Sequence, residues 1–97
     1  MDDCPFHDQD AIPQIASTHR FQWEKAQDCY VILYPEGMVK LNGSAAEILK
    51  RCNGEMSVAE LIRDLNDQFP DADVAADAFR FLQVAHENGW ICAKQSP

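Results

Sequence analysis

The stretch from Val31 to Leu49 reads VILYPEGMVKLNGSAAEIL and predicts most of the fold. It joins an apolar strand, a tight turn, a second strand at Met38–Leu41 and the start of a capped helix. In the turn, Pro35 fixes φ at about −65°, and Gly37 is expected to supply the positive φ of a type II turn. The two strands on either side of this turn therefore form a hairpin.

One more strand is predicted before this hairpin. Arg20–Glu24 alternates polar and apolar residues, which is typical of a half-buried strand. Cys29–Tyr34 is apolar on both faces, which favours the central position in the sheet. Met38–Leu41 then becomes an outer edge with unpaired backbone groups. A sheet of three short strands needs helices packed against it to be stable.

Two helices are expected to follow, each opened by a capping box. Ser44–Glu47 begins the first helix, which is expected to end at Asn53–Gly54. Ser57–Glu60 begins the second, which ends before Pro70. The second helix carries an apolar stripe at helical spacing: Val58, Leu61, Ile62, Leu65 and Phe69.

A third helix is expected from Asp73, its cap, to Asn88–Gly89. Its apolar face consists of Val74, Ala78, Phe81, Leu82 and Ala85. Trp90 and Ile91 then return to the core or pair with the end of a strand. The predicted fold is α+β, a three-stranded antiparallel sheet followed by a three-helix bundle, which is similar to a winged helix-turn-helix.

The length of 97 residues supports one domain. We predict an acidic N-terminal arm over 1–18, a folded domain over 19–92 and a C-terminal tail over 93–97. The arm contains two prolines and four acids and has no sustained periodicity, so it is expected to be extended or mobile. Its apolar residues Ile12 and Ile15 lie against the body or against a second copy of the chain, which leaves a homodimer open.

The net charge of −8 disfavours nucleic acid and anionic membranes as partners, because both are bound through Lys and Arg. No apolar run approaches the roughly 20 residues of a membrane span, and the N-terminus lacks the basic start of a secretion signal. We therefore expect a cytoplasmic protein. Its four cysteines form no CxxC pair and are expected to be free thiols.

Catalysis and metal binding find little support in the sequence. Cys4 and His7 have CxxH spacing, but the second pair, His86 and Cys92, is spaced wrongly for a structural zinc site. Cys52 lies on the predicted apolar face of its helix, where a thiol is an inert hydrophobe. No glycine-rich phosphate loop is present. We expect neither an enzyme nor a bound metal or cofactor.

Two binding functions remain. A winged helix-turn-helix DNA-binding regulator fits the architecture, but the third helix has Asp73, Asp77 and Glu87 against the single base Arg80. Peptide binding by strand addition fits the open edge at Met38–Leu41 better. In a third arrangement, the N-terminal arm or a second subunit covers that edge.

Two long segments closely resemble the PqqD family of pyrroloquinoline quinone biosynthesis. They are HRFQWEKAQDCYVILYPEGMVKLNGSAAEILKRCNGEMSVAELIRDL and FLQVAHENGWI, which lie between His19 and Ile91. The part LYPEGMVKLNGSAAEIL is specific in detail, because strand-turn-strand physics would accept many other sequences there. The arm before His19 has no such support.

The resemblance implies a peptide adaptor without a cofactor of its own. Family members are recognition elements for ribosomally made peptides, so the chain is expected to bind the precursor peptide PqqA. It would present that peptide to the radical S-adenosylmethionine enzyme PqqE. The peptide adds a strand beside the third strand, in a groove with the third helix. The implied site residues are Met38, Val39, Lys40, Leu41, Phe79, Leu82, Gln83 and His86.

Overall fold

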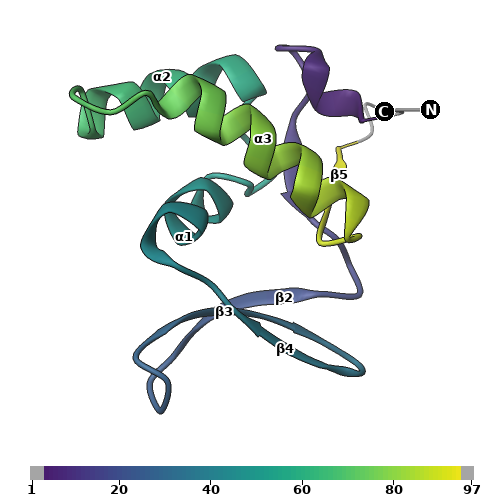
Figure 1. Ribbon diagram of the computed structural model, residues 1–97. Coiled ribbons are helices and arrows are strands. Elements are labelled where there is room, and N and C mark those ends of the chain that lie inside the picture. The colour runs from purple at the N-terminus through teal and green to yellow at the C-terminus, as the bar shows by residue number, and fades with distance from the viewer. Residues whose placement is uncertain (1–3, 95–97) are drawn as a thin grey trace.

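Three short strands form an antiparallel sheet, and three helices lie on one side of it (Figure 1). The computed structural model describes residues 4–94. The sheet contains β2 (Arg20–Glu24), β3 (Cys29–Tyr34) and β4 (Gly37–Lys40), in the order β2-β3-β4. The helices are α1 (Gly43–Lys50), α2 (Val58–Gln68) and α3 (Val74–Glu87). The predicted α+β fold class and the central position of β3 are confirmed.

The turn between β3 and β4 differs from the prediction. Tyr34 pairs directly with Gly37, so only Pro35 and Glu36 lie in the loop. Neither Glu36 nor Gly37 has a positive φ, and the predicted type II turn is wrong. Proline at the first loop position suits either turn type, and the sequence therefore indicates the hairpin but not its turn class.

The outer edge of β4 presents its backbone groups at alternate residues. The Leu41 N–H donates to the Tyr30 carbonyl at 3.0 Å, and in an antiparallel ladder the hydrogen-bonded pairs alternate with non-bonded ones. Val39, opposite Ile32, is the next residue directed toward β3. The N–H and C=O groups of Met38 and Lys40 consequently point away from the sheet. Among the described residues, no strand pairs with this edge.

The start and end of α1 also differ from the prediction. The Asn42 side chain accepts a hydrogen bond from the Ala45 N–H at 2.8 Å, so Asn42 is the cap and Ser44 lies inside the helix. Asparagine is as good an N-cap as serine, and Asn42, which comes earlier in the chain than Ser44, begins the helix. The helix ends at Lys50, before the predicted Asn53–Gly54. The predicted capping box of α2, between Ser57 and Glu60, is confirmed.

The N-terminal residues from Cys4 onward pack on the helices, in contrast to the extended or mobile arm predicted over 1–18. The strand β1 (Pro13–Ile15) pairs with β5 (Ile91–Ala93), and the short 3-10 helix η1 (Pro5–His7) lies beside α3. Phe6 is 1% exposed. Residues 1–3 of the predicted arm and 95–97 of the predicted tail lie outside the described residues, and Ala93 of that tail belongs to β5.

Backbone carbonyls of this N-terminal segment complete the start of α2. The Val58 N–H donates to the Ala11 carbonyl at 2.9 Å, and the Ala59 N–H donates to the Gln9 carbonyl at 3.1 Å. These are two of the four N–H groups that a helix leaves unpaired at its start. The capping box satisfies others, so α2 depends on both local and distant partners.

No helix among the described residues is long and apolar enough to span a bilayer.

Replacing Phe6 by Ala should lower the free energy of unfolding by about 3–5 kcal/mol, because a fully buried phenyl ring leaves a cavity. Urea denaturation measures this change. Gln9→Ala is the matched control, since it removes an exposed side chain and keeps the carbonyl that α2 uses. A Phe6→Ala protein as stable as its parent would show that the segment does not dock.

Amide hydrogen exchange should alternate along β4. The N–H groups of Val39 and Leu41 are expected to be protected by β3, whereas those of Met38 and Lys40 face solvent and should exchange much faster. Two-dimensional NMR after transfer to deuterated buffer resolves each amide. Equal protection at all four positions would contradict the orientation of this edge.

Candidate functional site

The four implied positions on the third strand of the sheet have unequal access to a partner. Met38 is 40% exposed and Lys40 is also exposed, and both direct backbone groups outward. Val39 is half-buried, and Leu41 is 7% exposed in the core. A peptide strand that joins this edge therefore meets the backbone of Met38 and Lys40, while Val39 and Leu41 hold the strand to the body.

The four implied positions on α3 do not share one accessible surface. Leu82 is fully buried, and Phe79 is half-buried against the core. The His86 ring makes an edge contact with Phe6 of η1, with 5.8 Å between the centroids. Gln83 is half-buried and donates to Glu87 at 3.4 Å. The structure thus turns the His86 side of α3 toward the N-terminal segment.

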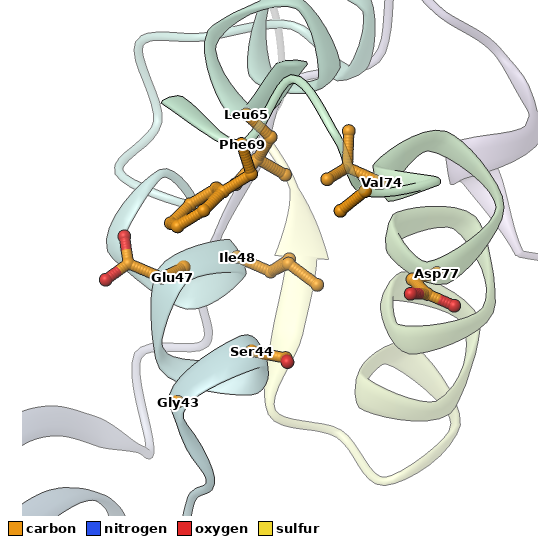
Figure 2. A pocket seen from close by; sticks show the side chains of 9 residues that line it. Gly43, Ser44, Glu47, Ile48, Leu65, Phe69, Val74 and Asp77 are labelled. Carbon is orange, nitrogen blue, oxygen red and sulfur yellow. The ribbon is translucent and has the colours of Figure 1, made fainter. Parts of the chain in front are cut away.

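The opposite side of α3 faces α1 across a pocket of about 330 Å³ (Figure 2). Ile48 from α1 and Val74 from α3 point into the space between the two helices, and Phe69 lies at its rim. We call this cavity the α1–α3 pocket. It is lined by Gly43, Ser44, Glu47, Ile48, Leu65, Phe69, Ala72, Val74 and Asp77.

A buried arginine holds the α1 wall of this pocket in place. Arg51 is 8% exposed and donates to the Glu47 carbonyl oxygen at 2.7 Å and to the Asp64 carboxylate at 2.6 Å. It also contacts the Glu47 carboxylate at 3.1 Å. This hydrogen bond from Arg51, together with Lys50, lowers the pKa of Glu47 below its ordinary value of 4.5. Glu47 is therefore ionised at neutral pH, and Arg51 and Lys50 balance its negative charge.

Two properties of the described side chains bear on metal binding and on nucleophilic chemistry. Among residues 4–94, no three His, Cys, Asp or Glu side chains cluster as metal ligands. Burial raises the pKa of the Cys52 thiol to about 12, so it stays protonated and is a poor nucleophile. The edge of β4 presents outward backbone groups, and the α1–α3 pocket is lined largely by apolar side chains; both kinds of surface suit the binding of an extended chain.

Reasoning from the sequence missed the α1–α3 pocket. Helical periodicity predicts the buried centre of α3 but does not tell which flank is free, and that choice depends on where Phe6 docks. One signal was available: Phe69 comes directly before Pro70, at the end of α2, and is 39% exposed. An exposed ring that joins other apolar side chains in one patch, as Phe69 joins Ile48, Leu65 and Val74, can mark a contact surface.

Comparisons with known proteins place the chain in a family. Residues 29–91 match the model of the family described as coenzyme PQQ synthesis protein D (PqqD). A protein of Azotobacter vinelandii named PqqA binding protein is 52% identical over 82% of this chain and 88% of its own. One of the same name from Acinetobacter baylyi is 52% identical, over 76% of each chain.

A solved structure shares the fold. The NMR structure of the PqqD truncation of Methylobacterium extorquens PqqCD, titled a stand-alone recognition element for ribosomally made, modified peptides, has a TM-score of 0.69 and 22% identity. The alignment covers 95% of this chain and 99% of that one. At this identity the likeness concerns the fold alone. From the family match and the close relatives, this chain belongs to the PqqD family.

Proposed function

We propose that this chain is a peptide-binding adaptor of pyrroloquinoline quinone biosynthesis. It binds the precursor peptide PqqA and presents it to the radical S-adenosylmethionine enzyme PqqE. The observation that carries this proposal is the outer edge of β4, which pairs with no strand within residues 4–94 and directs the backbone groups of Met38 and Lys40 outward. The name PqqA binding protein, shared by close relatives, supports the identity of the peptide.

PqqA binds as a fourth strand of the sheet. Main-chain hydrogen bonds to Met38 and Lys40 supply affinity that does not depend on sequence, and nearby side-chain surfaces supply selectivity. Val39 and Leu41 contribute indirectly, because their inward backbone groups and side chains keep the edge straight and attached to β3. The α1–α3 pocket, whose wall begins at Gly43 three residues after the end of β4, is a candidate for such a surface.

The chemistry performed on PqqA belongs to the partner enzyme PqqE. The adaptor contributes position, because a peptide held by one protein that also binds the enzyme gains effective concentration at the active site. The chain itself needs no cofactor and catalyses no step. Since PqqA is made on ribosomes, the adaptor works in the cytoplasm.

DNA binding, the other function that the fold suggests, is disfavoured by the surface of α3. Its base Arg80 is already paired with Asp77. Asp77 and Glu87 are exposed and would repel phosphates.

Lys40→Pro should weaken PqqA binding about fivefold to tenfold, because it removes one outward N–H that the added strand uses. Isothermal titration calorimetry with synthetic PqqA measures the change. Proline is tolerated at an edge position whose N–H faces solvent, so the melting temperature should fall only slightly.

Two variants control for charge and for folding. Lys40→Ala removes the ammonium group but keeps the N–H, and should bind within about twofold of the parent, as expected for a single exposed charge. Val39→Pro removes an N–H directed at β3 and should destabilise the sheet itself. If Lys40→Pro bound PqqA as tightly as the parent does, strand addition at β4 would be wrong.

A further inference from the structure

We infer that the α1–α3 pocket receives an apolar side chain of the bound peptide, and that it prefers one with a lysine or arginine next to it. This inference rests on the proposed function, since it concerns the part of the peptide that extends past the β4 edge. It adds the chemistry by which the adaptor selects its peptide.

The pocket wall begins only a few residues after the end of β4. β4 ends at Lys40, and the pocket wall begins at Gly43 and Ser44, three and four residues later. Three extended residues span roughly 10 Å, so a peptide needs only a few residues beyond the edge to arrive there. For an added strand antiparallel to β4, these residues lie on the N-terminal side of the strand.

The lining of the pocket favours an apolar side chain. Ile48 and Leu65 are 5% and 3% exposed and form part of its floor, and Val74 is half-buried on the α3 side. Phe69 is 39% exposed at the rim, which leaves part of an aromatic ring in water. An aliphatic or aromatic side chain in the pocket would cover this ring and gain from the burial of both surfaces.

The charges around the pocket favour a cationic neighbour. Asp71 and Asp73 flank the lining residue Ala72, and among the described residues neither has an ion-pair partner. The acids of the lining itself, Glu47 and Asp77, are paired with Arg and Lys side chains. The excess negative charge therefore lies in the loop between α2 and α3, and it attracts a base that sits just outside the pocket.

Filling the pocket tests the apolar part of the inference. Ala72→Tyr places a ring at an exposed position of the lining. We expect it to weaken binding of fluorescein-labelled PqqA about tenfold or more, with little change in melting temperature. Phe69→Ala should weaken binding about fivefold, from the lost apolar contact. Ala26→Tyr, at an exposed alanine of the β2–β3 loop, is the matched control and should bind like the parent.

Neutralising the rim tests the charge preference. Asp71→Asn with Asp73→Asn removes two negative charges and no capping bond, because the Asp73 side chain caps nothing. We expect PqqA to bind this double variant about threefold more weakly than it binds the parent at low salt, as for exposed charge pairs. The affinity of the variant should also fall less steeply than that of the parent as the NaCl concentration rises. Glu55→Gln with Glu87→Gln changes the net charge equally at exposed sites outside the pocket lining and should match the parent.

The outcomes separate this inference from the proposed function. If the parent protein does not bind PqqA, both are wrong. If the parent binds and Lys40→Pro weakens binding, but Ala72→Tyr and the Asp variants do not, only the pocket inference is overturned. If Ala72→Tyr leaves PqqA affinity unchanged and weakens the complex with PqqE, the pocket belongs to the enzyme and the inference is likewise overturned.

Discussion

The hydrogen bond from the Leu41 N–H to the Tyr30 carbonyl determines which backbone groups of β4 point toward β3 and which point toward a partner. It fixes which residues of the last strand face inward. Leu41 is buried, and the next residue, Asn42, caps α1. A shift of one residue in this pairing would turn Val39 outward and Met38 and Lys40 inward. The open edge and the α1 wall of the pocket therefore depend on one strand register.

The elements that the sequence predicted correctly are those with local causes. The period-two pattern of β2, the apolar run of β3 and the Ser57–Glu60 capping box each lie within a few residues of the structure they specify. The start of α1 was misplaced because Asn42 and Ser44 are both good caps, and only the position of Leu41 in the core decides between them.

The parts that the sequence did not predict depend on distant contacts. Phe6 packs beside His86, eighty residues later in the chain, and β1 pairs with β5 across a similar separation. No local sequence pattern in the acidic N-terminal segment predicts these contacts. These contacts determine which flank of α3 the N-terminal segment covers. They therefore explain why the helix positions implied by family resemblance lie mostly on the side away from the α1–α3 pocket.

The proposed pocket site also accounts for how a small acidic domain would select a peptide. Backbone pairing at an edge is permissive, and in our proposal the apolar pocket beside Asp71 and Asp73, which pair with no described base, adds a requirement for particular side chains. Arg51, bonded to Glu47 and Asp64, keeps α1 and α2 at a fixed spacing and so preserves the pocket before the peptide arrives. Such preorganisation reduces the ordering cost of binding.

A ¹H–¹⁵N correlation titration of the labelled protein with PqqA tests strand addition at β4 most directly. The account predicts that the amides of Met38 and Lys40 shift on binding and become protected from hydrogen exchange, because each gains a partner in the added strand. PqqA binding that leaves both of these amides unshifted and unprotected would contradict it.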